Sequence, residues 1–234
     1  MIRLAWSMFE SAMYPLIMVM CMWLTYFLNI DLQWHAEELG VRPHQISGLI
    51  GIATMPFLHE NLEHLFSNSL PLVVAGSFLF YYFKKLTWLI CAVVWVVGGG
   101  ILWCIGSPGT LHIGASGLVY GLVFFLLISG VIRAHRNLAA VALLMVFLYG
   151  SLVWGLFPEY VYIMKENISW EGHLGGAISG IAMAIILRKK GPPKPVDDIT
   201  PDDNDIEDDN PYWMQDEAHE ESSSEENNLP SDPK

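Results

Sequence analysis

Charged residues are scarce in this chain. Lys, Arg, Asp and Glu make up 15% of its 234 residues, whereas roughly 25% is usual for a soluble domain. Hydrophobic residues account for 53% of the chain, and 9 residues are tryptophan. This composition excludes an ordinary soluble globular domain over most of the chain and indicates a membrane protein.

Cysteines are equally few and lack the spacing of a disulfide framework or a zinc site. Cys21, Cys91 and Cys104 all fall inside apolar stretches, and their number is odd. We interpret them as small apolar packing residues. The sequence therefore implies neither a metal nor any other cofactor.

Basic residues are nearly absent from residues 191–234, where most of the acidic residues lie. The net charge of −12 therefore describes this segment and not the rest of the chain. The segment begins Gly-Pro-Pro-Lys-Pro, and proline cannot continue a helix. Its later Asp, Glu, Ser and Asn cannot bury enough apolar surface to fold alone. We expect a membrane domain at 1–190 and a disordered acidic cytoplasmic tail at 191–234.

Apolar stretches of spanning length fill the first part of the chain. A helix needs about 20 apolar residues to cross a bilayer, and such stretches lie near 11–30, 60–82, 86–106, 115–132, 137–157 and 172–188. The first lacks a small-residue cleavage site followed by a polar region, so we expect a retained span and not a removed signal peptide. The expected fold class is an all-α membrane protein, a bundle of six transmembrane helices with a disordered acidic C-terminal tail.

Lys and Arg fall mainly on one side of this alternation of spans. That side holds Arg3, Lys84, Lys85, Arg133, Arg136, Arg188, Lys189 and Lys190. The other side holds only Arg42 and Lys165. Because cytoplasmic loops are enriched in basic residues, we expect both termini in the cytoplasm. The N-terminal ends of the second, fourth and sixth spans then face the exterior.

Ser116 opens the fourth stretch within Gly114-Ala115-Ser116-Gly117. The small neighbours permit close helix packing and leave room for a substrate backbone beside the hydroxyl. A soluble nucleophile elbow, G-x-S-x-G, is excluded because position 118 is Leu and no strand precedes it. A serine that bonds to its own helix carbonyl and only helps packing remains the alternative.

His173 opens the sixth stretch and can supply a base. His173, Gly176 and Gly180 share one helix face, and Gly-x-x-x-Gly lets two membrane helices come close. If that face meets the glycines of the fourth stretch, the imidazole can reach the Ser116 hydroxyl. Tyr120, one turn after Ser116, would pack against the imidazole ring. Because no acid lies at a matching depth, we expect a dyad and not a triad.

His64 and Asn68 lie four residues apart at the start of the second stretch, hence on one helix face. Both can donate hydrogen bonds to a developing oxyanion. The alternative is a metalloprotease, because His59-Glu60 followed by His64 resembles H-E-x-x-H. The spacing is i, i+5, which sets the two histidines about 140° apart around a helix, and no third ligand is evident.

Taken together, these motifs resemble the rhomboid intramembrane serine proteases. They are His59-x4-His64-x3-Asn68, Gly114-Ala115-Ser116-Gly117 and His173-x2-Gly176-x3-Gly180, in that order across the apolar stretches. The resemblance covers about residues 10–190. It implies Ser116 as the nucleophile and His173 as the general base and then acid.

The resemblance also assigns supporting roles. It implies an oxyanion hole from His64, Asn68 and the Ser116 backbone N–H, with Tyr120 stacked on His173. Gly114 would keep the substrate path open, and His59 would brace the loop beneath the second span. The implied partners are lipid and single-span membrane proteins, cut near the outer end of the span after a small residue, with no nucleic acid. The implied location is a bacterial inner (plasma) membrane, and the oligomeric state is left open.

The first long loop departs from the family pattern. Many bacterial rhomboids carry a Trp-Arg pair there, whereas residues 31–58 contain Arg42-Pro43-His44. We expect the loop to lie partly in the outer interface as a lateral lip. The acidic tail has no counterpart among the family motifs.

Two other function classes remain open. A proton-coupled carrier should show an acidic residue in the middle of a span, and none is found. A catalytically inactive homologue that binds membrane proteins should lack Ser116 or His173, and both are present.

Overall fold

The computed structural model describes residues 2–148, 154–159 and 168–193. They belong to the first of the two units into which the chain divides, Met1–Pro195 and Val196–Lys234. Every regular element in these described ranges is helical, which agrees with the expected all-α class. Nearly all of the expected acidic tail lies outside the described residues, so its disorder stays a prediction.

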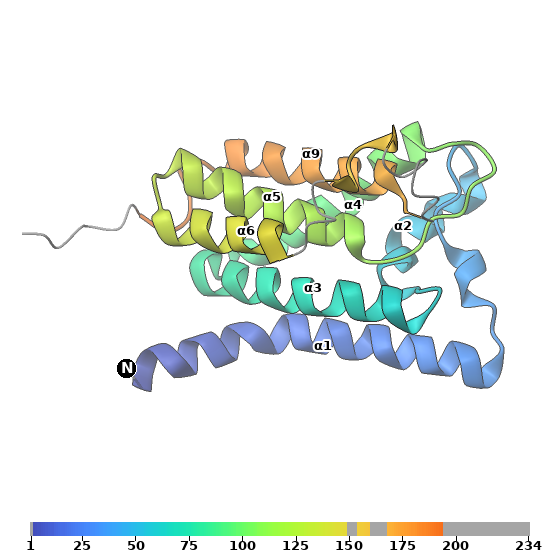
Figure 1. Cartoon of the computed structure of the whole chain (residues 1–234), viewed down its shortest axis with the longest axis horizontal. Helices are drawn as coiled ribbons and strands as arrows, with labels where there is room; N and C mark the ends of the chain where they lie inside the picture. Colours follow the sequence, from blue (N-terminus) through green and yellow to red (C-terminus); the bar gives the residue numbers. More distant parts are fainter. Residues whose placement is uncertain (1, 149–153, 160–167, 194–234) are drawn as a thin grey trace, which may run out of the picture. The chain divides into compact units, whose positions relative to one another are not determined.

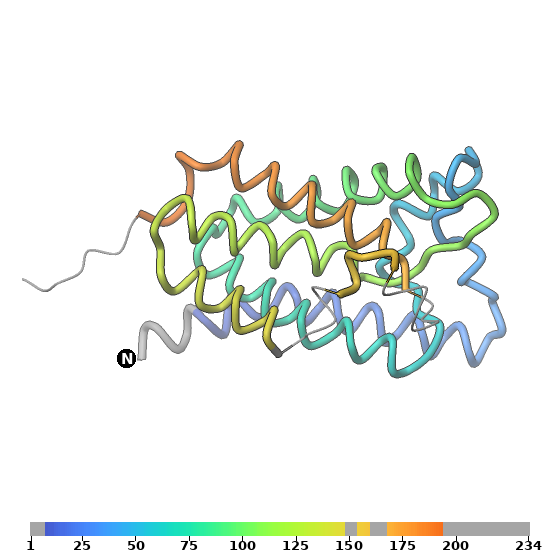
Figure 2. The backbone as a smooth tube through the Cα atoms, turned by 45° about the horizontal axis from the view of Figure 1, so that its top comes forward, coloured from blue at the N-terminus to red at the C-terminus, as the bar shows by residue number. Residues whose placement is uncertain are grey.

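The long helices lie side by side in a bundle (Figures 1 and 2). They are α1 (Ile2–Leu32), α3 (Leu62–Phe83), α4 (Leu86–Ile105), α5 (Ser116–Ile132), α6 (Arg136–Leu148) and α9 (Trp170–Ile186). Helix α1 packs along α3, while α9 packs against both α4 and α5, and α6 packs against α5. The helix that carries Ser116 is thus in contact with the helix that carries His173.

The basic clusters of the sequence gather at one end of this bundle. The start of α1, the α3–α4 turn, the α5–α6 turn and the end of α9 all lie at the left of Figure 1. These are the positions at which most Lys and Arg residues were found. The expected up-and-down path is therefore present, and the side of the membrane that this end faces stays a prediction.

Among the residues that the structure describes, three helices are long and apolar enough to cross a membrane, namely Met8–Leu32, Leu62–Phe83 and Leu86–Ile105. Helices α5 and α9 have 17 residues each, or about 25 Å at 1.5 Å per residue, against a hydrocarbon layer of about 30 Å. The expected fifth span at 137–157 runs into residues 149–153, which are outside the described residues. Six spans therefore remain a prediction.

Glycines allow α9 to approach α5 and α4 closely. A Cβ added at Gly176 would lie 2.8 Å from the carbonyl carbon of Gly117, and one added at Gly180 would lie 2.8 Å from that of Gly121. A Cβ at Gly98 of α4 would lie 3.3 Å from Gly176. The predicted meeting of the two glycine faces is therefore present. Between membrane helices such close packing, and not the hydrophobic effect, stabilises contact.

The first long loop folds into short helical turns at the end of the bundle opposite the basic clusters (Figure 1). They are η1 (Ala36–Leu39), η2 (Ile46–Leu49), α2 (Ile50–Thr54) and η3 (Met55–Phe57). Trp95 and Trp103 of α4 donate indole N–H bonds to the carbonyls of Ile52 and Gln45, so α4 anchors the loop. Ile46 is 85% exposed, which is compatible with the expected contact with lipid.

Candidate active site

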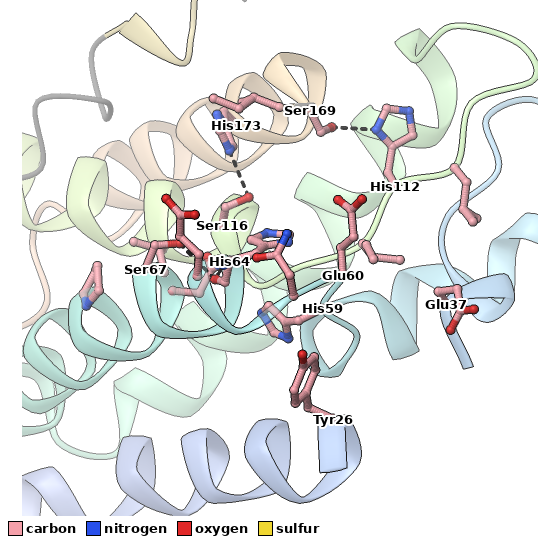
Figure 3. Close-up of a pocket in the computed structure, with 18 of the residues that line it drawn as sticks. Tyr26, Glu37, His59, Glu60, His64, Ser67, His112, Ser116, Ser169 and His173 are labelled. Carbon is pink, nitrogen blue, oxygen red and sulfur yellow. Dashed lines mark hydrogen bonds between the residues drawn. The ribbon is translucent and has the colours of Figure 1, made fainter. Parts of the chain in front are cut away.

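Ser116 is the first residue of α5, at the end of the α4–α5 loop. The loop is held just before it, because the Gly114 N–H donates to the Met55 carbonyl at 2.8 Å. Gly114 has a φ of +106°, a conformation that glycine adopts far more readily than other residues. This turn presents the half-buried Ser116 to a cavity of about 1150 Å³ (Figure 3).

His173 lies in the first turn of α9, which begins with a side-chain cap. Ser169 is the N-cap, and its hydroxyl oxygen accepts the Gly172 N–H at 3.2 Å. His173 is 7% exposed, and its Nε2 lies 2.9 Å from Ser116 Oγ, as the dashed line in Figure 3 marks. The serine and the histidine therefore meet at hydrogen-bond distance, 57 residues apart in the chain.

A backbone carbonyl determines which nitrogen of His173 carries the proton. Nδ1 lies 2.9 Å from the Gly155 oxygen, and a carbonyl can only accept a hydrogen bond. Nδ1 is therefore the protonated nitrogen of the neutral ring, and Nε2 is the acceptor that faces the Ser116 hydroxyl. In a catalytic triad a carboxylate has this orienting role. Sequence reasoning missed Gly155, because a backbone oxygen leaves no pattern in the sequence.

The ring of Tyr120 stacks on the imidazole ring of His173. The two rings lie 4.0 Å apart with an interplanar angle of 10°, and both side chains are buried. The stack restricts rotation of the imidazole about its side-chain bonds. This arrangement agrees with the expected packing of Tyr120, which lies four residues after Ser116 on the same helix face.

His64 and Asn68 reach the same cavity from α3. The Asn61 side chain caps α3 by accepting the His64 N–H at 2.8 Å. The Asn68 amide donates to the His64 carbonyl at 2.8 Å, which leaves its second N–H for another acceptor. A Cβ added at Gly114 would lie 2.6 Å from His64 Nε2 and 3.8 Å from Asn68 Nδ2. Both side chains therefore lie beside the turn that presents Ser116.

His59 lies beneath this group, in the segment between η3 and α3. It is 5% exposed, and its ring packs edge-on against that of His64 with centroids 5.0 Å apart. Within the described residues neither of its ring nitrogens has a hydrogen-bond partner. His59 thus supports His64 by packing, and the predicted bracing of the loop stays a prediction.

Three glutamates contribute to the lining of the cavity. Glu37, Glu60 and Glu63 line it together with Asn29 at the end of α1. The amide of Asn29 donates to a Glu37 carboxylate oxygen at 3.0 Å, and this hydrogen bond lowers the pKa of Glu37 below its ordinary value. Glu37 therefore stays ionised and adds negative charge to the lining of the cavity.

Comparison with known proteins agrees with this geometry. The family model for the rhomboid domain matches residues 47–190, and the chain therefore belongs to the rhomboid family. Members of this family are integral membrane proteins, and the family is generally one of intramembrane serine proteases. The family resemblance of the sequence motifs is thereby confirmed, while the roles of the individual site residues stay predictions.

The relatives come from bacteria and a virus. An uncharacterised protein of Mycobacterium tuberculosis (strain ATCC 25618 / H37Rv) is 36% identical over 154 residues, which cover 63% of each chain. An uncharacterised protein of Mycobacterium leprae is 36% identical over 157 residues, or 64% of this chain and 61% of the relative. A protein of Acanthamoeba polyphaga mimivirus, whose name describes a rhomboid protein, is 25% identical over 146 residues, which cover 60% of this chain and 77% of the relative. The chain thus spans less than two thirds of the mycobacterial relatives.

Proposed function

We propose that this protein is an intramembrane serine endopeptidase with Ser116 as nucleophile and His173 as general base and acid. The observation that carries the proposal is the 2.9 Å hydrogen bond between Ser116 Oγ and His173 Nε2, in a chain of the rhomboid family. The Gly155 carbonyl supports the same assignment, because it leaves Nε2 as the nitrogen that accepts a proton. A nucleophile needs a base at this distance.

The reaction follows from these two groups. Ser116 Oγ attacks the carbonyl carbon of the scissile peptide bond as its proton moves to His173 Nε2. The tetrahedral intermediate collapses when the C–N bond breaks, and His173 gives the proton to the leaving amine. A water molecule then loses a proton to His173 and attacks the acyl-enzyme ester. This step releases the new carboxylate and returns the proton to Ser116.

The oxyanion hole that we propose consists of His64, Asn68 and the Ser116 backbone N–H. The first N–H groups of a helix have no acceptor within it, and the N-terminus of α5 adds positive potential. The second N–H of Asn68 is available, and His64 lies against Gly114 in the same cavity. Donors aimed at the developing charge are often the largest catalytic effect.

The substrates proposed are single-span membrane proteins that are cut near the outer end of the span. A peptide must leave helical hydrogen bonding to present its carbonyl, and unpaired backbone groups are costly in lipid. Spans with a Gly or Pro in their outer third should therefore unwind most readily. The proposal includes a six-span protein of a bacterial inner membrane with both termini cytoplasmic, because the basic clusters lie at one end of the bundle.

The test is cleavage of a model single-span substrate by purified protein in detergent. Ser116→Ala and His173→Ala should each reduce turnover below one tenth of wild type, and a fluorophosphonate should label wild type but not Ser116→Ala. Ser67→Ala is the matched control. Its hydroxyl faces the same cavity but bonds to the His64 carbonyl at 2.9 Å, so activity should persist. Turnover above one tenth in either dyad variant would refute the assignment.

A further inference from the structure

His112 lies at a junction of three segments near the candidate site. It belongs to the α4–α5 loop, and its side chain is 8% exposed. Its Nδ1 lies 2.7 Å from the Ser169 hydroxyl oxygen, as Figure 3 shows, and its Nε2 lies 2.7 Å from the Thr110 hydroxyl oxygen. Its backbone N–H and carbonyl pair with the carbonyl and N–H of Val41 in the first long loop, each at 2.9 Å.

The direction of each hydrogen bond follows from the partners. Thr110 donates its hydroxyl proton to the Ser107 carbonyl at 2.6 Å, so its oxygen can only accept from His112 Nε2–H. Nδ1 of a neutral ring is then an acceptor, and the Ser169 hydroxyl donates to it. Burial lowers the pKa of His112, although the Glu171 carboxylate opposes the shift. The neutral form of His112 is therefore favoured, as its hydrogen bonds to Ser169 and Thr110 require.

Ser169 connects this chain to the base. It is the N-cap of α9, its hydroxyl oxygen accepts the Gly172 N–H, and its carbonyl accepts the His173 N–H at 3.1 Å. The first turn of α9 is therefore held from outside by the His112 ring. His112 is also close to the nucleophile in sequence, because Ser116 follows it by only four residues. One residue thus joins the two segments whose spacing sets the Ser116–His173 distance.

We propose that His112 is a positioning residue that holds the first turn of α9 through Ser169, and so keeps His173 within hydrogen-bond distance of Ser116. The inference rests on the proposed function of this pair. The pairing with Val41 matters because it holds His112 against the first loop, so the ring is a fixed acceptor for Ser169. Reactive groups that shift by about 1 Å can lose on the order of 10²-fold in rate.

Three substitutions at position 112 separate the two side-chain bonds. His112→Asn keeps an acceptor near the place of Nδ1, facing Ser169. His112→Gln keeps a donor near the place of Nε2, facing Thr110, and loses the acceptor. His112→Phe keeps the ring and loses both. If the bond to Ser169 carries the effect, kcat should stay within about threefold of wild type for Asn and fall at least about tenfold for Gln and Phe. KM should change less than kcat, because the proposed role of the bond to Ser169 is to position His173.

A double-mutant cycle tests whether the effect passes through Ser169. In a Ser169→Ala background the partner is already absent, so His112→Phe should lower kcat by less than about twofold further. His44→Phe is the matched control. His44 Nε2 lies 3.0 Å from the Gly106 carbonyl, so this histidine also joins the first loop to the α4–α5 loop, but its bond does not involve α9. Its kcat should stay within about twofold of wild type.

Several outcomes overturn the inference. They are equal kcat for the Asn and Gln variants, a full further loss from His112→Phe in the Ser169→Ala background, or a KM effect without a kcat effect. If His112→Phe does not fold, the comparison of kcat between His112→Asn and His112→Gln still tests the inference. Fluorophosphonate labelling separates this inference from the proposed function. An unlabelled wild type would refute the function, whereas labelling at equal rates in wild type and His112→Gln would refute only the role of His112.

Discussion

Gly176→Ala tests whether the close approach of α9 to α5 sets the geometry of the candidate dyad. The added methyl would lie 2.8 Å from the Gly117 carbonyl carbon and 3.2 Å from its Cα. The Gly117 carbonyl oxygen would lie closer still. Carbon atoms prefer separations of about 3.5 Å or more, so the helices would have to part by at least about 0.7 Å. Gly117 follows Ser116 directly, and Gly176 lies one turn after His173. The 2.9 Å bond between Oγ and Nε2 would then lengthen to about 3.6 Å or more, a distance that is no longer a hydrogen bond.

The expected loss of kcat is on the order of 10²-fold, with a loss of stability of about 1–3 kcal/mol from overpacking. The measurements are cleavage of a model substrate, the rate of fluorophosphonate labelling, and thermal unfolding in detergent. Gly100→Ala of α4 is the matched control, because a Cβ there meets nothing within 4 Å. It should change neither activity nor labelling, and it should raise stability slightly if at all, since alanine favours helix more than glycine does.

Cleavage by Gly176→Ala within about twofold of wild type would refute the link between helix spacing and the dyad, since an overpacked interface should move the pair apart. An equal loss of activity in Gly100→Ala would refute it as well. In that case any added methyl in these helices would have the same effect, and the close contact would not be the cause. A loss of stability with unchanged kcat would show that the bundle can absorb the methyl without moving either reactive group.

Three further predictions concern the oxyanion hole and the topology. Gly114→Ala should lower the rate of cleavage by about 10- to 100-fold, because its φ of +106° disfavours alanine and the methyl would displace His64; a variant as active as wild type would show that His64 is not a donor. Asn68→Ala should lower the rate by up to about 10²- to 10³-fold, which is less than the loss in Ser116→Ala, and an unchanged rate would remove Asn68 from the hole. A reporter fused after Lys190 should report the cytoplasm, and an external signal would reverse the orientation.

Much of the candidate site could be predicted from local spacing. Ser116 and Tyr120 are four residues apart, and so are His64 and Asn68, so each pair must share a helix face once the helix forms. The glycines at 176 and 180 likewise indicate a face that another helix can approach closely. These inferences held because they need only the periodicity of one helix and the small size of glycine.

The contacts of backbone groups could not be predicted in the same way. The Gly155 carbonyl orients His173, and the pairing of Val41 with His112 brings together residues of two different loops. Every residue has a main-chain carbonyl oxygen, and every residue except proline has a main-chain N–H. The sequence therefore contains nothing that singles out these positions. The fifth apolar stretch, at 137–157, runs past Leu148 into residues 149–153, which lie outside the described residues, so its full length stays a prediction.

By itself the sequence determined the membrane character, the helical class, the family motifs and the residues that could react, because composition and helical periodicity are local properties. Only the tertiary structure decided that Ser116 Oγ lies 2.9 Å from His173 Nε2, and that His112 and Ser169 lie within hydrogen-bond distance of each other. Both pairs are 57 residues apart. Their spacing depends on how closely whole helices pack and on how the loops pair, which no single stretch of sequence contains.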